Sequence, residues 1–282
     1  MEVHLLPPVR QTLWGRLAVA NFFLGGTGAG AYVLAAVLSA FERSPVLVTA
    51  SVLGPALVLA GFLCVAVEAG RPLRGPFVLR KVGSSWMSRE LWVGGAFSVF
   101  AITDLLWPFL TLRVAATVAA LLFALAQGAI LWRAKGVSAW SVPLMPPLFL
   151  ASAFISGAGM LGLILPLLGG GDNPGSLAVS MGGLIVLSAL VWAGYLAWPG
   201  DLAFRRATAA FWTNTTVVGV FVLGHLVALL LLGFWASAFV WTMAAAGILV
   251  LLGQLQAKAW LILRSGVLRP ITIPHLPLRR ES

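Results

Sequence analysis

Charged residues are scarce in this sequence. Asp, Glu, Lys and Arg make up 9% of its 282 residues, whereas 60% of the residues are apolar. Soluble proteins have roughly 25% charged residues, so this chain has too few charges to cover the surface of a water-soluble domain. The composition excludes a soluble domain and a disordered chain. It indicates an all-α, polytopic membrane protein.

Cysteine and histidine are also rare, which limits the cofactors that the chain can hold. Cys64 is the only cysteine, so no intrachain disulfide can form. An iron–sulfur cluster or a cysteine-based zinc site needs about four ligands and cannot be held by this chain alone. Of the three histidines, only His225 lies in a long apolar stretch. A membrane b-type haem usually takes two axial histidines, so we expect no haem and no metal in this chain.

Long uncharged stretches define the expected membrane spans, because a helix needs about 20 mainly apolar residues to cross the hydrocarbon core. The stretch 207–257 carries no charge and is long enough for two spans joined by a turn. We therefore predict eight transmembrane helices in one polytopic domain that covers residues 1–282. Their expected limits are 16–40, 49–69, 89–110, 113–133, 146–168, 175–197, 210–232 and 237–263.

The basic residues are distributed unevenly over the predicted loops. With eight spans both termini lie on one side, and that side carries 16 of the 18 Lys and Arg residues. Only Arg43 and Arg113 fall on the other side. By the positive-inside rule both termini are expected in the cytoplasm. The expected location is the cytoplasmic (inner) membrane of a bacterium or archaeon. The net charge of +10 is thus explained by topology, and the expected surroundings are membrane lipid rather than nucleic acid.

A short sequence similarity links the first and fifth predicted spans. Thr27–Gly30 resembles Ser156–Gly159, and both segments follow a run that contains Phe and Leu. The similarity is consistent with two four-helix halves in parallel orientation. The alternative is chance similarity between segments of small residues.

Polar side chains inside the spans are functional candidates, because such groups are costly in a bilayer. His225, in the middle of the seventh span, could bind a proton, a quinone oxygen or a metal, or make an ordinary interhelical hydrogen bond. Gln127, near the basic end of the fourth span, could donate a hydrogen bond to a quinone carbonyl or make an ordinary interhelical hydrogen bond. The other candidates are Asn21, Tyr32, Glu68, Asp104, Asn214, Gln254 and Gln256.

Three further features lie near the basic side. The glycine run that begins at Gly25 permits either close helix packing or a groove for a flat ring or an isoprenoid tail. Glu68 and Arg71 are spaced to pair at the end of span two and form a charged rim. Ser88 is expected to cap span three, with Glu90 favoured in the first turn by the helix dipole.

Four segments together resemble the NrfD/PsrC family, the membrane subunits of polysulfide reductase-type enzymes. Segment 21–32 is similar to the first helix of the family, and segment 68–72 is similar to its Asp-Leu-Gly-Arg-Pro end of helix two. Segment 85–92 resembles the start of helix three, and segment 146–157 resembles the start of helix five. The similarity covers spans one to five and is weak in spans six to eight.

This resemblance implies a haem-free anchor that binds a quinone, either menaquinone or ubiquinone. The implied partners are a ferredoxin-like iron–sulfur subunit with four clusters and a molybdopterin catalytic subunit. The family places a polar residue in helix one at the quinone, here Asn21, and a Tyr before the Gly of helix four. In this chain the Tyr position is Ala126, with Gln127 beside it.

The sequence hypothesis is a quinone-reactive anchor subunit of a respiratory oxidoreductase that exchanges electrons between the quinone pool and an iron–sulfur partner. Asn21, Gly25, Glu68 and Gln127 would bind the quinone. Glu68 or His225 would relay protons, whereas Arg71, Ser88 and Arg89 would dock the partner. Two alternatives remain: a secondary transporter, and a structural anchor whose quinone site has been lost.

Overall fold

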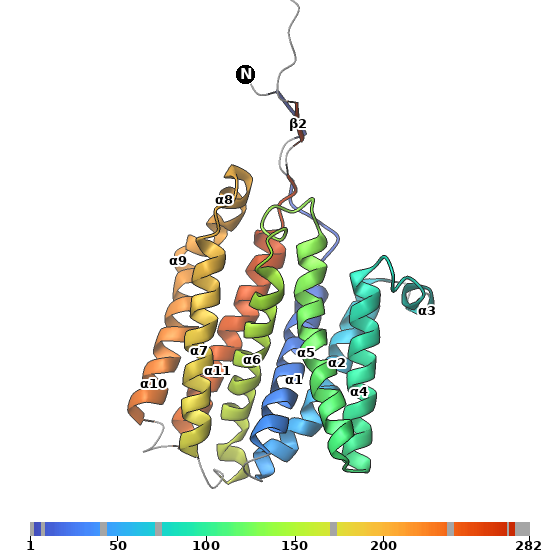
Figure 1. Cartoon of the computed structure of the whole chain (residues 1–282). Helices are drawn as coiled ribbons and strands as arrows, with labels where there is room; N and C mark the ends of the chain where they lie inside the picture. Colours follow the sequence, from blue (N-terminus) through green and yellow to red (C-terminus); the bar gives the residue numbers. More distant parts are fainter. Residues whose placement is uncertain are drawn as a thin grey trace, which may run out of the picture.

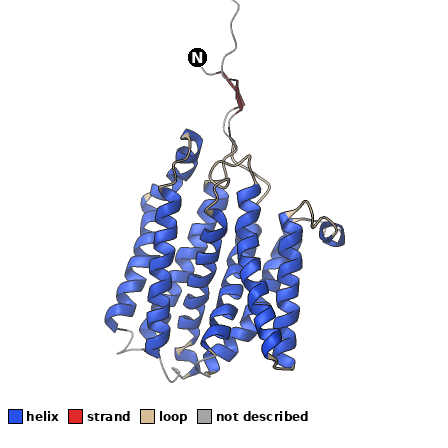
Figure 2. Cartoon of the chain, in the orientation of Figure 1, coloured by secondary structure: helices blue, strands red, loops and turns tan. Residues whose placement is uncertain are grey.

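The protein is a bundle of long helices (Figures 1 and 2). The computed structural model describes residues 3–6, 9–39, 44–70, 75–169, 174–235, 240–269 and 271–273. The long helices are α1 (Arg16–Leu38), α2 (Pro45–Glu68), α4 (Trp86–Leu106), α5 (Leu110–Arg133), α6 (Met145–Ile164), α7 (Pro174–Leu196), the continuous rod α9 (Asn214–Thr216), η4 (Val217–Val227) and α10 (Ala228–Trp235), and α11 (Val240–Ala259) with η5 (Trp260–Arg264). The short elements are α3 (Gly75–Leu79), α8 (Leu202–Thr208), η2 (Pro166–Leu168), η3 (Ala209–Trp212) and the strands β1 (Val3–Leu6) and β2 (Ile271–Ile273).

The expectation of a helical membrane protein is confirmed. Among the described residues, seven helices are long and apolar enough to cross a membrane. Helix α4 is not one of the seven, although it is 21 residues long and packs against α2 and α5. It carries Arg89, Glu90 and Asp104, which make it less apolar than the others. The count of eight spans therefore stays a prediction.

Two helices begin earlier than expected because serines cap them. Helix α2 begins at Pro45 rather than at residue 49, since Ser44 accepts a hydrogen bond from the Leu47 amide and Pro45 takes the first position. Helix α4 begins at Trp86, and its cap is Ser85, whose hydroxyl accepts the Ser88 amide. The prediction that Ser88 is the cap was wrong. Its side chain lies inside the first turn, so it is free to bond elsewhere.

Helix α1 packs against α2, α5, α6 and α11, and glycines let it approach two of them closely. A Cβ atom on Gly28 would overlap the Gly54 carbonyl oxygen of α2, and one on Gly30 would overlap the Ala153 carbonyl oxygen of α6. In a bilayer such backbone contact replaces the hydrophobic force that is missing between helices. On the α6 side, Gly157 in turn lies against Gly30, so the two similar segments of the sequence touch each other.

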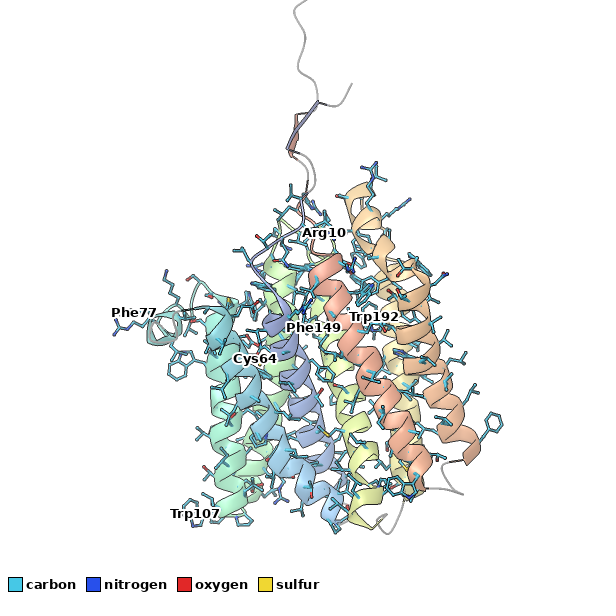
Figure 3. All side chains as sticks on the ribbon, turned by 180° about the vertical axis from the view of Figure 1, so that it is seen from behind. Arg10, Cys64, Phe77, Trp107, Phe149 and Trp192 are labelled. Atoms are coloured by element: carbon cyan, nitrogen blue, oxygen red, sulfur yellow. The ribbon has the colours of Figure 1, made fainter. Side chains whose placement is uncertain are left out.

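The first and last described segments meet at one end of the bundle, where Figure 1 shows the two strands. Strand β1 pairs antiparallel with β2, and Arg10 forms a bridge with Val267. The Gln11 amide donates to the Gly266 carbonyl at 2.8 Å. Trp107 lies at the opposite end from Arg10 (Figure 3). Both terminal segments thus share one end, here called the terminal end, and its cytoplasmic location stays a prediction.

Candidate functional site

A cleft of about 140 Å³ lies at the terminal end, between the start of α1, the end of α2 and the start of α4. Its lining combines apolar side chains with one amide and two carboxylates. The residues are Leu13, Trp14, Ala18, Asn21, Phe22, Val65, Glu68, Ala69, Met87, Glu90 and Ile130. Pockets for drug-sized ligands measure about 300–1,000 Å³, so this cleft fits a single ring rather than a large cofactor.

Three buried polar side chains from three helices meet beside the cleft; Asn21 and Glu90 line it, whereas Gln127 lies behind them and does not. Asn21 Nδ2 of α1 donates to Glu90 Oε1 of α4 at 3.3 Å, and Gln127 Nε2 of α5 donates to the same oxygen at 3.3 Å. Gln127 Nε2 also lies 3.5 Å from the Asn21 carbonyl oxygen. The three side chains are at most 5% exposed. The three side chains form one buried, hydrogen-bonded polar cluster beside the cleft.

Two glycines make the cluster sterically feasible. A Cβ atom on Gly25 would lie 2.7 Å from Gln127 Nε2 and 2.9 Å from the Phe123 ring, so glycine there lets Gln127 reach Glu90. A Cβ atom on Gly61 of α2 would lie 2.9 Å from Asn21 Oδ1. Gly25 thus serves the site by leaving room for a side chain, whereas Gly28 and Gly30 serve helix packing.

Asn21 has an unused acceptor beside the cleft, on the side of Gly61. Among the described residues, its Oδ1 atom is buried and has no hydrogen-bond partner. A buried amide oxygen without a partner costs about 1–3 kcal/mol. A ligand that offers a hydroxyl or an N–H group at this point would recover that free energy.

Glu68, at the end of α2, is one of the residues that line the cleft. Its Oε1 atom accepts a hydrogen bond from the Gly15 amide, which fastens the end of α2 to the start of α1. Arg71, its expected partner, lies outside the described residues. The rim is completed by Trp14, which stacks on Trp140 with the ring centroids 5.2 Å apart, and by Leu13, which is 84% exposed.

Ser88 and Arg89 hold the segment between α3 and α4. The buried Ser88 hydroxyl donates to the Val78 carbonyl oxygen. Arg89 donates from Nε to the Val82 oxygen and from Nη2 to the Gly83 oxygen, each at 2.9 Å. Helix α3 projects from the side of the bundle with Phe77 exposed (Figure 3). The two residues therefore shape the surface beside the cleft. Ser88 does so as a buried side chain bonded to α3, and Arg89 does so through the 82–83 backbone.

His225 is not brought to the cleft. It lies in η4, where Nδ1 is 2.8 Å from the Val220 carbonyl oxygen and Nε2 is 3.1 Å from the Ser188 hydroxyl of α7. It is absent from the residues that line the cleft. Both ring nitrogens are engaged in helix-to-helix and local bonds, which matches the interhelical alternative stated for this residue.

Sequence reasoning missed two residues of the region. From the sequence, Glu90 is expected only as a favourable charge in a first helical turn, whereas in the structure its Oε1 atom accepts hydrogen bonds from both Asn21 and Gln127. Lys258 was counted only among the basic residues of the terminal side, yet it is 3% exposed. The available signals were a carboxylate and an ammonium inside the predicted spans 89–110 and 237–263.

A comparison with protein-family models decides the family. The model described as polysulphide reductase, NrfD, matches residues 8–270. The chain belongs to the NrfD family. NrfD proteins are membrane subunits of polysulfide reductase-like oxidoreductases. Among curated proteins, the search found no match. In this NrfD chain the position where the family resemblance expects a Tyr is the buried Ala126, and the neighbouring Gln127 supplies the polar group that faces Glu90.

Proposed function

We propose that this NrfD chain is a haem-free quinone-binding subunit that exchanges electrons between the quinone pool and an iron–sulfur partner. The observation that carries the proposal is a ring-sized cleft lined by Asn21, Glu68 and Glu90, beside which Asn21 Oδ1 has no hydrogen-bond partner among the described residues. A quinone and its quinol differ by two electrons and two protons, so a site for them needs both hydrogen-bonding groups and proton acceptors.

The cleft offers both kinds of group. Asn21 Oδ1 would accept a hydrogen bond from a ring hydroxyl, and the Glu90 carboxylate beside it would hold a proton released there. Glu68 stands nearer the mouth and would pass a proton toward the water at the terminal end. The apolar walls formed by Phe22, Val65 and Ile130 would contact the faces of the ring and its tail.

The electron acceptor or donor must be another chain, because Cys64 is the only cysteine here. We propose an iron–sulfur subunit seated at the terminal end, with a molybdopterin subunit behind it. This arrangement follows from the position of the cleft, since electron transfer is fast only when a cluster lies close to the ring. The surface formed by α3, Arg89 and the 80–85 turn is then the docking region.

The secondary-transporter alternative is less well supported. Transporters of that kind place their polar groups near mid-membrane between broken helices. Here the cluster of Asn21, Glu90 and Gln127 lies near the terminal end of the bundle, beside the cleft.

The test uses the complex purified from its native membrane. Turnover driven by a short-chain ubiquinol or menaquinol should fall at least about ten-fold in Asn21→Leu, because a ring hydrogen bond worth about 1.4 kcal/mol is lost. The matched control is Asn214→Leu, which removes an exposed amide at the start of α9. Electron transfer within the partner subunits, measured with an artificial dye, should be the same in all three proteins. Full quinol turnover in Asn21→Leu would overturn the site, and a purified complex without iron–sulfur signals would overturn the partner.

A further inference from the structure

A second buried polar cluster lies next to the first, between α6 and α11. Lys258 Nζ donates to the Ser152 hydroxyl, and that hydroxyl donates to Gln254 Oε1 at 2.7 Å. The ammonium also lies 5.6 Å from the centroid of the Phe149 ring. Among the described residues, no carboxylate comes within ion-pair distance of Lys258. A buried ammonium with one neutral partner is costly unless a negative charge compensates it.

Gly26 of α1 lies between Lys258 and the cluster that contains Glu90. A Cβ atom on Gly26 would lie 3.5 Å from Gln127 Oε1 and 3.7 Å from Lys258 Nζ. The two atoms therefore flank the same point on α1, and no side chain of residue 26 stands between them. Because residue 26 is glycine, no Cβ atom stands between Gln127 Oε1 of the first cluster and Lys258 Nζ of the second.

Gln127 thus has one end toward each buried charge. Its Nε2 atom donates to the Glu90 carboxylate at 3.3 Å, and its Oε1 atom faces the side of α1 on which Lys258 Nζ lies. This is the orientation that electrostatics favours, because the positive end of the amide dipole meets the anion and the negative end meets the cation. The two charges also fix which way the amide points.

We propose that Lys258 is a positioning residue of the cleft, which compensates the charge of Glu90 and orients Gln127 across Gly26. The three groups come from α4, α5 and α11. Gln127 thus connects Glu90 in the cleft wall with a helix that contributes no residue to the cleft itself. Its effect on quinone chemistry rests on the proposed function, whereas the coupling of the two charges is a property of the chain alone.

The first test is a double-mutant cycle on the thermal stability of the purified complex, with Lys258→Met, Glu90→Gln and the pair. Each single variant leaves one buried charge uncompensated, so each should lower the unfolding midpoint. The double variant is neutral at both positions and should recover at least half of the summed loss. In a Gln127→Leu background this recovery should shrink. Additive losses, or a recovery that is unchanged without Gln127, would overturn the proposal.

A second variant keeps the test informative if Lys258→Met does not fold. Gly26→Ala places a methyl group at ordinary contact distances, so the bundle should still form, but the methyl separates the ammonium from the amide. Its control is Gly182→Ala, where the added methyl would meet only Leu229 Cδ1, at 3.6 Å. Gly26→Ala should lower the unfolding midpoint more than the control does. An equal effect of the two changes would contradict the bridge.

Quinol kinetics separate a positioning role from a merely structural one. Lys258→Met should raise the KM for a short-chain quinol about three-fold or more with a smaller change in kcat, because Gln127 and Glu90 lose their fixed orientation. A loss of kcat with unchanged KM would count against the proposal. If no quinol reacts with the unmodified complex, the proposed function fails, while the stability cycle still decides the coupling.

A small anion bound from solution is the other group that would compensate the positive charge of Lys258. Replacing chloride by gluconate should leave the unfolding midpoint of the unmodified complex unchanged if Glu90 is the counter-charge. A midpoint that falls in gluconate, and does so equally in Glu90→Gln, would assign the compensation to a bound anion and overturn the proposal.

Discussion

Asn21 Nδ2 donates a hydrogen bond to Glu90 Oε1 at 3.3 Å, which joins the first turns of α1 to those of α4. The two residues are 69 positions apart in the sequence. The bond uses one of the two N–H donors of the Asn21 amide, and the Oδ1 atom has no partner among the described residues. The pairing therefore turns the amide nitrogen toward Glu90 and the amide oxygen toward Gly61.

Gly61→Ala should impair the binding of quinol without removing any polar group. The added methyl would lie 2.9 Å from Asn21 Oδ1, so it would shield that oxygen or displace it. We expect the KM for a short-chain quinol to rise roughly three- to ten-fold, which corresponds to about 1 kcal/mol. Steady-state kinetics of the purified complex measure this. The control is Gly95→Ala on α4, where nothing lies within 4 Å of the new methyl, and a KM equal to that of the control would contradict the role of Oδ1.

Gly30→Ala should destabilise the bundle rather than change the site. Its Cβ atom would overlap the Ala153 carbonyl oxygen, so α1 and α6 would have to move apart. Overpacking of this kind costs about 1–3 kcal/mol, and we expect a clear fall in the unfolding midpoint measured by fluorescence-detected thermal unfolding. Gly183→Ala on α7, which has open space around it, should leave the midpoint nearly unchanged. Equal midpoints for the two variants would count against backbone contact between α1 and α6.

His225→Ala should weaken the packing of η4 against α7 and leave quinol turnover within about two-fold. The change removes the hydrogen bond to Ser188, and such interhelical bonds contribute about 0.6 kcal/mol on average. The measurement is turnover beside thermal stability, with Ser188→Ala as the partner variant. A strong loss of turnover in His225→Ala, but not in Ser188→Ala, would restore the hypothesis that His225 relays protons.

The span count and the orientation can be tested by cysteine labelling, because Cys64 is the only cysteine to be replaced. In a Cys64→Ala background, Leu13→Cys marks the terminal end and Trp107→Cys marks the opposite end; the native side chains are 84% and 61% exposed. If the Arg-rich side is cytoplasmic, a membrane-impermeant maleimide should label position 107 in intact cells and position 13 only after lysis. Labelling of both positions from outside would refute the eight-span topology.

The family and the membrane character could be predicted from the sequence because they depend on local composition. Uncharged stretches of about 20 residues specify helices in lipid regardless of their neighbours. Motifs such as segments 21–32 and 146–157 are contiguous in the chain, so the resemblance to the NrfD family can be seen without a fold. Asn21 and Glu68 were found for the same reason: a polar side chain inside an apolar run is conspicuous.

Glu90 and Lys258 could not be assigned from the sequence, since both stand near span ends where charged residues normally face water. Only the packing of α4 and α11 against the rest of the bundle buries them. Ser88 was misassigned as the cap for a related reason: Ser85 and Ser88 both precede an apolar run, and the geometry of the first turn alone distinguishes them.

The sequence by itself determined that this chain is a helical membrane protein of the NrfD family with few polar groups inside its spans. That information is carried by hydropathy and by short contiguous motifs, which act along one helix at a time. The tertiary structure decided which polar groups meet. Asn21, Glu90 and Gln127 come from three helices, and their contact depends on glycines that let those helices approach, which is a property of distances across the bundle.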